Sequence, residues 1–254
     1  MTDFCIETTA IHDEYIHEYN KNFEGLIDKL PNTQFFLVTT NPELAIKKPN
    51  LKVVDISLYL ANGHTFTKSY HHKTGFCNIL QSTRYGLYEA CLYGYTKVIH
   101  LQTDMTYSDE ITDEKLSGHF KFGIHFDMGG ETVGKKLQTN DKKTKFLAEY
   151  SERYQINDHN INDIPTGDDP VVFLMFDSPL KFILYLSKLS LLCYKTSHYP
   201  EFTTGIADEL TFAMYLIGVP SQIHTPQDAK YFDVNHQRLH NKHYVDRNTQ
   251  VKES

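Results

Sequence analysis

Residues 79–105 decide the fold class of this chain and read ILQSTRYGLYEACLYGYTKVIHLQTDM. The first half places apolar residues at helical spacing and stops at Gly94, a residue that commonly follows the end of a helix. The run 97–101 is short, apolar and β-branched, which predicts a buried strand. That strand leads directly into Asp104, so the sequence predicts an acid at the carboxyl end of a strand.

An acid in this place has two interpretations. In open α/β sheets, ligands bind in the crevice beyond the carboxyl ends of the strands, where a carboxylate can hold a metal ion or a ribose. An Asp that follows a strand can also form a turn or cap the next helix. Asp104 is therefore a candidate site residue, with capping as the alternative.

Helical and strand patterns alternate along the rest of the chain. A helical face at 16–30 and a strand at 34–40 form the expected opening unit, because each has the spacing typical of its class. Further expected elements are a strand at 51–55, a strand at 171–176, a helix from 178, a helix from 208 to 217 and a strand at 219–224. This order predicts an α/β fold in which a mostly parallel, Rossmann-like sheet is flanked by helices.

The pattern predicts a single domain over residues 1–244. Residues 129–167 are rich in Lys, Asn and Asp and poor in large apolar side chains, so we expect an insertion there. Residues 245–254 form a polar tail. No glycine-rich loop of the GxGxxG or GxxxxGK[ST] type follows any expected strand, so an ordinary dinucleotide site or P-loop is not expected.

Composition excludes several partner classes. The chain has 254 residues and a formal net charge of -7, which disfavours nucleic acid or an anionic membrane surface as the main partner, although a local basic groove is compatible with an acidic average. Its four cysteines have no paired spacing, which is typical of reduced thiols and predicts a cytoplasmic location. The most apolar stretch, 180–193, is too short to span a bilayer, and no secretory signal opens the chain.

The order of these pieces resembles the nucleotide-sugar glycosyltransferases of the GT-A fold. The resemblance lies in three segments: 35–41 (FFLVTTN), 86–105 with its helix, strand and acid, and 208–213 (DELTFA). It implies a single GT-A-like domain that takes a nucleotide-sugar donor and a glycan or glycoconjugate acceptor. In the family, the strand corresponding to 97–101 ends in an Asp-any-Asp motif that binds a divalent metal.

The motif is degenerate here, because Gln102 stands in the place of the first acid of Gln102-Thr103-Asp104. Gln102 can hydrogen-bond a ribose or lie in an outer metal shell, but it brings no charge. The resemblance implies a Mn²⁺ or Mg²⁺ cofactor with Asp104 and a late histidine, His236, as candidate ligands. Whether the metal is required stays open at this point.

The resemblance also implies roles for residues at other strand and helix ends. A carboxylate at the mouth of the helix from 208 would act as the general base toward the acceptor, which makes Asp208 and Glu209 the catalytic candidates. Donor contacts are expected from strand ends and one helix cation: Thr39, Thr40, Asn41, Asp55, Arg84, Gln102, Thr103 and Asp104. Lys68 and Lys73 are further candidates to offset the diphosphate charge.

The expected function is therefore sugar transfer from a nucleotide-diphosphate sugar to a hydroxyl group. One alternative is a nucleotidyltransferase, although that class usually has a glycine- and lysine-rich first loop, which residues 39–42 (TTNP) lack. A second alternative is a catalytically inactive domain that binds nucleotide sugars, which Gln102 keeps open.

Overall fold

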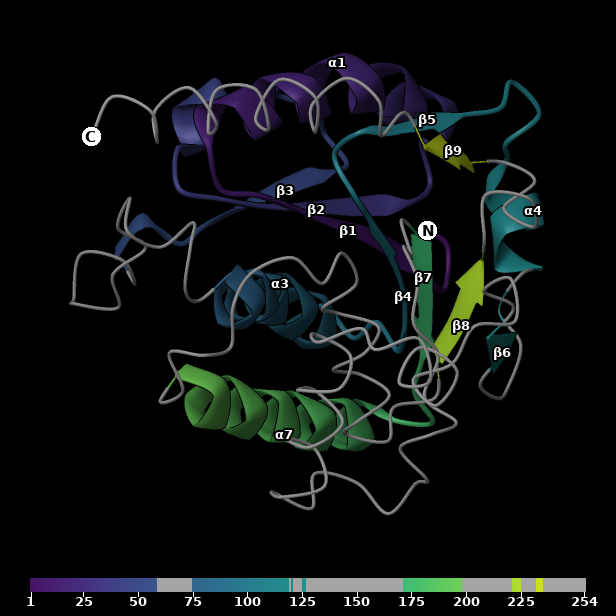
Figure 1. Cartoon of the computed structure of the whole chain (residues 1–254). Coiled ribbons are helices and arrows are strands. Elements are labelled where there is room, and N and C mark those ends of the chain that lie inside the picture. Colours follow the sequence, from purple (N-terminus) through teal and green to yellow (C-terminus); the bar gives the residue numbers. More distant parts are fainter. Residues whose placement is uncertain are drawn as a thin grey trace, which may run out of the picture.

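The computed structural model of the chain contains one main β-sheet, and helices cover both of its faces (Figure 1). Strands and helices alternate along most of the sequence. The structure describes residues 1–58, 75–118, 120, 125–126, 171–197, 221–224 and 232–234. This arrangement confirms the predicted α/β class. The expected insertion at 129–167 and the tail at 245–254 lie outside the described residues.

The predicted elements that fall in the described residues begin and end close to their predicted positions. The strands are β1 (Cys5–Ala10), β2 (Gln34–Thr39), β3 (Leu51–Asp55), β4 (Lys97–Leu101), β5 (Met105–Tyr107), β6 (His125–Phe126), β7 (Val171–Met175), β8 (Ser221–His224) and β9 (Phe232–Val234). The helices are α1 (Asp13–Lys29), η1 (Pro42–Leu44, a 3-10 helix), α3 (Gly75–Leu92), α4 (Asp113–Ser117) and α7 (Pro179–Ser197). Of these elements, β1, η1, β5, α4, β6 and β9 were not predicted.

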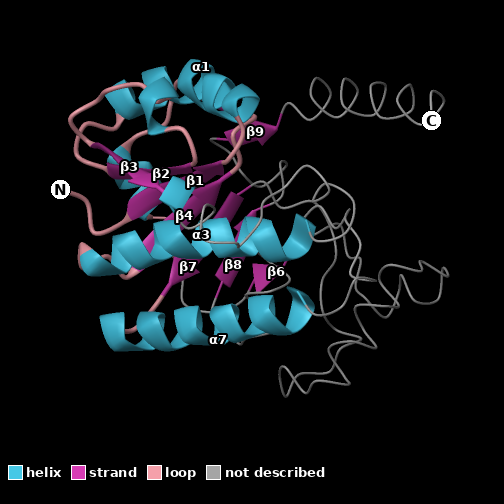
Figure 2. Ribbon diagram, turned by 90° about the vertical axis from the view of Figure 1, so that its left-hand side faces the viewer, coloured by secondary structure: helices cyan, strands magenta, loops and turns pink. Residues whose placement is uncertain are grey.

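The main sheet has the order β3-β2-β1-β4-β7-β8-β6, and β5 pairs with β9 in a separate two-stranded ribbon. Strands β3, β2, β1 and β4 are mutually parallel, whereas β7 is antiparallel to both of its neighbours. The sheet is thus mostly parallel on the side that begins with β3. The helices lie in layers: α1 covers one face, α3 covers the other, and α7 packs outside α3 (Figures 1 and 2).

The prediction that a helix opens the fold is wrong, because β1 precedes α1 and occupies a central place in the sheet. The strand that carries Thr39 is therefore the second strand of the chain, not the first. The physical reason is Glu7, an acid in the middle of β1 that interrupts the apolar run typical of a buried strand. Glu7 is nevertheless fully buried.

The two faces of β1 have different chemistry. Ile6 and Ala10 face α1 and pack in a hydrophobic cluster with Ile16, Tyr19 and Phe23 of that helix. Glu7 points to the opposite face, where α3 passes so close that a Cβ atom on Gly86 would lie 2.6 Å from the Glu7 side chain. The absence of a side chain at Gly86 thus makes room for a buried acid.

Glu7 is held by a short polar network. Its Oε2 lies 2.5 Å from Nδ1 of His100, the register partner of Glu7 on β4. Its Oε1 accepts a hydrogen bond from Thr9 Oγ1 at 3.0 Å, and the Thr9 and Thr83 hydroxyls lie 3.3 Å apart. The network therefore connects β4, β1 and α3. A buried polar group of this kind is tolerated because its hydrogen-bonding capacity is met inside the protein.

Gly86→Ala should destabilise the fold, because the new Cβ would lie 2.6 Å from Glu7 and 2.7 Å from Val38 Cγ2. Overpacking of this kind costs about 1–3 kcal/mol of unfolding free energy, measurable by urea denaturation. The matched control is Gly118→Ala at the end of α4, where φ is -66° and the new Cβ would lie 3.5 Å from its nearest neighbour. A Gly86→Ala protein as stable as the Gly118→Ala protein would contradict the tight approach of α3.

Candidate functional site

The strand order reverses between β1 and β4. From β1, the chain adds β2 and then β3 on one side, and β4 then pairs with the other side of β1. In an open α/β sheet, such a topological switch point opens a crevice at the carboxyl ends of the two strands, because the following connections lead away in opposite directions. Here the two ends are Ala10 and Leu101, and the register Glu7↔His100 places these ends at similar height.

The segment that leaves β4 is fastened to α1. Thr103 donates a hydrogen bond from Oγ1 to Glu18 Oε2 at 3.1 Å, and Asn22 Nδ2 donates to the Thr103 carbonyl at 2.9 Å. Glu18 and Asn22 are four residues apart and therefore share one face of α1. Thr103 is buried, whereas Gln102 and Asp104 on either side of it are partly exposed. The helix thus fixes the backbone on which these two side chains stand.

The switch point is acidic. Burial raises the pKa of Glu18, the hydrogen bond from Thr103 opposes this shift, and the negative charge of Asp104 raises the pKa further. Glu14 adds to the effect and Lys21 reduces it. Two carboxyl groups from different elements therefore act on each other at the end of β4. Such a pair suits a cation or the hydroxyl groups of a sugar better than a bare anion.

The end of β2 supports the neighbouring connection from β1 to α1. Thr40 Oγ1 donates to the Ile11 carbonyl at 2.5 Å, and Asn41 Nδ2 donates to Asp13 Oδ1 at 3.3 Å. Thr39 is fully buried, and its hydroxyl accepts a hydrogen bond from the Asn41 backbone N–H at 3.2 Å. In this structure the three side chains therefore hold the loop that borders the crevice.

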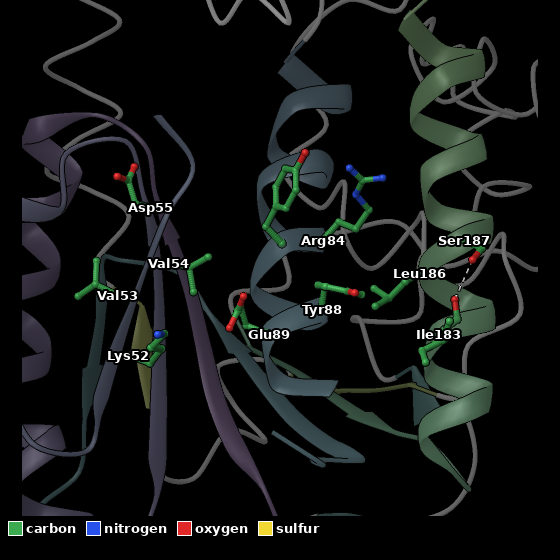
Figure 3. A pocket seen from close by; sticks show the side chains of 11 residues that line it. Lys52, Val53, Val54, Asp55, Arg84, Tyr88, Glu89, Ile183, Leu186 and Ser187 are labelled. Carbon is green, nitrogen blue, oxygen red and sulfur yellow. Dashed lines mark hydrogen bonds between the residues drawn. The ribbon is translucent and has the colours of Figure 1, made fainter. Parts of the chain in front are cut away.

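A cavity of about 470 Å³ lies on the α3 side of the sheet, between β3, α3 and α7 (Figure 3). Two residues that the sequence analysis proposed separately, Asp55 and Arg84, both line it. The Asp55 carboxylate points away from Arg84 (Figure 3), and its Oδ1 accepts a hydrogen bond from the Ser57 backbone N–H at 2.8 Å. The walls of the cavity combine apolar residues with charged and aromatic ones, and it is lined by Lys52, Val53, Val54, Asp55, Arg84, Tyr85, Tyr88, Glu89, Ile183, Leu186 and Ser187. Pockets of this size and mixed lining accept small organic ligands.

The sequence-predicted residues thus fall into three groups. Gln102, Thr103 and Asp104 lie at the switch point, Thr39, Thr40 and Asn41 lie beside the loop after β1, and Asp55 and Arg84 line the cavity. Asp208, Glu209 and His236, with Lys68 and Lys73, lie outside the described residues, and their roles stay predictions. Within the described part of the chain, no three His, Cys, Asp or Glu side chains are grouped as a metal site would require.

Glu18 and Asn22 were missed by sequence reasoning, which treated α1 only as an amphipathic helix. Both residues occupy positions outside its apolar stripe, where polar residues are ordinary. The one available signal was spacing, since an acid and an amide four residues apart share a helix face that can turn toward a neighbouring strand end. Nothing in the local sequence indicated that this neighbour was the segment 102–104.

Comparisons with known proteins give structural neighbours but no family. No family model matches the chain, and no curated protein matches it. Among solved structures, the chain is similar to the apo structure of WbbM, a bifunctional glycosyltransferase, with a TM-score of 0.45 and 11% sequence identity. The match covers 85% of this chain and 37% of that chain, so the protein spans well under half the length of its structural relative.

No described helix has both the length and the apolar character needed to cross a bilayer. The thiols of Cys5 and Cys91 are free and buried, and burial raises the pKa of both.

Glu18→Gln should stabilise the protein at neutral pH and leave it unchanged in acid. The pKa of Glu18 is raised above its ordinary value of 4.5, so the native state holds more protons than the unfolded state in the window above that value. The stability contributed by the protonated acid is therefore lost as pH rises through this window. The neutral amide removes this loss and can still accept the Thr103 hydrogen bond.

The measurement is urea unfolding from acid to neutral pH, with a chelator present. Glu43→Gln, which removes an exposed acid of η1, serves as the control and should show no gain that grows with pH. A Glu18→Gln protein less stable than the native protein at neutral pH would mean that burial of the ionised Glu18, close to Asp104, is not a cost to folding.

Proposed function

We propose that this protein transfers a sugar from a nucleotide-diphosphate sugar to a hydroxyl acceptor. The observation that carries the proposal is the switch point itself, where Asp104 follows β4 and lies beside Glu18 of α1. A crevice of this kind is where open α/β sheets bind their ligands. The sequence resemblance to nucleotide-sugar glycosyltransferases supports the same chemistry, because it centres on the same strand and acid.

A divalent cation, Mn²⁺ or Mg²⁺, is part of this proposal. Two carboxyl groups, those of Asp104 and Glu18, are the oxygen ligands that this end of β4 offers, so substrate phosphates and water would have to complete the shell. Mg²⁺ is commonly held by one or two carboxylates together with substrate phosphates and water. Asp104 and Glu18 would hold the ion, which would offset the charge of a diphosphate leaving group.

Glu18 would thereby supply the second acid that Gln102 does not. Gln102 keeps a neutral donor and acceptor beside Asp104, suited to a ribose or sugar hydroxyl. The role of α1 is to hold the segment through Thr103, which fixes the backbone that carries Gln102 and Asp104.

The nucleoside would lie toward β3. Asp55 and Thr39 are register partners, and three neighbouring strand pairings separate Asp55 from the end of β4. At a spacing of about 4.8 Å for each pairing, this distance is ~14 Å. An extended nucleoside diphosphate can span it, with its ribose near Asp55, a phosphate near Arg84 and its far end at Asp104. Tyr85 and Tyr88 offer aromatic surface beside Arg84.

The acceptor hydroxyl needs a general base. On the sequence resemblance, we assign this role to Asp208 or Glu209 at the mouth of the predicted helix 208–217, which makes inversion of the anomeric configuration the expected outcome. His236 is a further proposed metal ligand.

A second candidate function is binding of a nucleotide sugar without turnover. The observation that favours it is Gln102, which removes a charge where the resembling enzymes have an acid. Incubation with UDP, GDP and CDP sugars separates the possibilities. Release of the nucleoside diphosphate supports transfer or hydrolysis, whereas binding without release supports the second function. Consumption of nucleoside triphosphates with release of pyrophosphate would instead indicate a nucleotidyltransferase.

Asp104→Asn should weaken donor binding or turnover by at least about tenfold, because the amide keeps the shape of the side chain and removes its charge. Calorimetric titration with each nucleotide sugar, with and without Mn²⁺, measures the affinity. Asp109→Asn removes an exposed acid paired with Lys29 and serves as the control. Gln102→Asp should increase the dependence on Mn²⁺. Equal affinities for the native and Asp104→Asn proteins would return Asp104 to a turn-forming role.

Arg84→Gln and Asp55→Asn should separate the two ends of the cavity. Arg84→Gln should lower affinity for a nucleoside diphosphate by about tenfold and leave affinity for the free nucleoside unchanged, since only the diphosphate has an anion for the guanidinium. Asp55→Asn should lower both affinities. Lys52→Gln, at the far end of β3 but lining the same cavity, is the matched control. If neither Arg84→Gln nor Asp55→Asn changes nucleotide affinity relative to the Lys52→Gln control, the nucleoside does not bind in this cavity.

A further inference from the structure

Helix α7 is positively charged in a chain that is negative overall. Its 19 residues contain three lysines and no acid, whereas the whole chain has a net charge of -7. Lys181 and Lys188 are both exposed and stand seven residues apart, which places them on one side of the helix. This helix therefore presents a local positive surface that the overall charge conceals.

The outer face of α7 is also apolar. Leu180 is 76% exposed, Leu184 is 54% exposed and Ile183 is 46% exposed, whereas Phe182 and Leu186 are buried. Residues 180 and 184 are neighbours on a helix face, with Ile183 beside them. We call the exposed residues Leu180, Lys181, Ile183, Leu184 and Lys188 the outer surface of α7.

Helix α7 begins beside the end of α3. Cys91 Sγ donates to the Pro179 carbonyl at 3.7 Å, which joins the end of α3 to the start of α7. Helix α7 forms the outermost described layer on the side of the sheet opposite α1 (Figures 1 and 2).

We infer that the outer surface of α7 binds an anionic lipid bilayer, with the helix axis parallel to the membrane. Interfacial helices combine exposed leucine or aromatic residues with lysines that flank them, and their binding depends on both. Lysine stems lie along apolar surface while their ammonium groups reach the lipid headgroups. Acidic parts of the described surface are repelled by the same headgroups, which favours approach through this face.

The lysines of α7 favour a membrane, and not a second copy of the chain, as the partner of this surface. Two outer surfaces brought together would place Lys181 and Lys188 of one copy near those of the other, and α7 has no acid to pair with them. Lys181 does contact Asp177, and Lys188 lies over the Tyr185 ring at 5.4 Å. Exposed contacts of this kind are weak, so both lysine ammonium groups can exchange them for contacts with anionic lipid headgroups.

This inference is independent of the proposed sugar transfer. It also differs from a membrane crossing, because a helix that lies in the headgroup region buries only one face. The cavity that contains Arg84 shares Ile183 with the outer surface of α7, so the cavity opens beside the proposed membrane contact.

The experiment is co-sedimentation of the full chain with sucrose-loaded vesicles. One set is phosphatidylcholine alone, and the other is an equal mixture with phosphatidylglycerol. We expect at least about tenfold stronger partition to the anionic vesicles, weakening as salt screens the charges. Leu180→Glu/Leu184→Glu should reduce partition to anionic vesicles by at least about tenfold, and Lys181→Gln/Lys188→Gln by about fivefold for each lysine.

The matched control is Lys47→Gln/Lys115→Gln, which removes two exposed lysines away from α7, one of them also paired with an acid. Urea unfolding of each variant verifies that the fold is retained. Equal partition to neutral and anionic vesicles overturns the inference, and so does unchanged binding of the Leu180→Glu/Leu184→Glu protein. A dimer in light scattering that this variant dissociates would assign the surface to a second copy instead.

Discussion

The buried contact between Glu7 and His100 is the constraint on which the rest of the structure depends. The two side chains lie 2.5 Å apart on adjacent parallel strands, and the Glu7 side chain has no exposed surface. Removing these groups from water is costly, so the net gain in stability from the pair is small, but separating them would leave an unpaired polar group in the core. The pair therefore specifies the register of β1 and β4 more than it stabilises the fold. Gly86 makes this arrangement possible, because any side chain on α3 at that point would occupy the space of the acid.

Register and site are connected through this pair. His100 is two residues from Gln102, and a slip of one residue between β1 and β4 would turn every side chain of β4 to the opposite face. The correct register places the end of β4 next to the loop after β1, where α1 fastens Thr103 through Glu18 and Asn22. The acidic character of the switch point therefore results from two elements that only the sheet order brings together.

The molecule also separates its charges by layer. Glu18 and Asp104 lie at the end of β4 and along α1, while the lysine-bearing α7 lies beyond α3 on the other side of the sheet. The cavity between β3, α3 and α7 contains both signs of charge.

The sequence by itself determined the fold class and most element boundaries, because periodicity reports burial on one face. Strands β3 and β4 coincide with their predicted ranges, and α1 begins within three residues of the expected position. It also placed Asp104 after the end of a buried strand, because an acid in that place is visible in the sequence alone, and the role of Asp104 stays a prediction. It failed at β1, because a single buried Glu7 breaks the apolar run, and the partner that makes this acid tolerable is 93 residues away. Three features were visible only in the tertiary structure. The charge of Asp104 acts on Glu18, Asp55 and Arg84 line the same cavity, and Leu180 and Leu184 of α7 are exposed. Each of these facts depends on which surfaces of distant elements meet, and local spacing contains no information about a helix's neighbours.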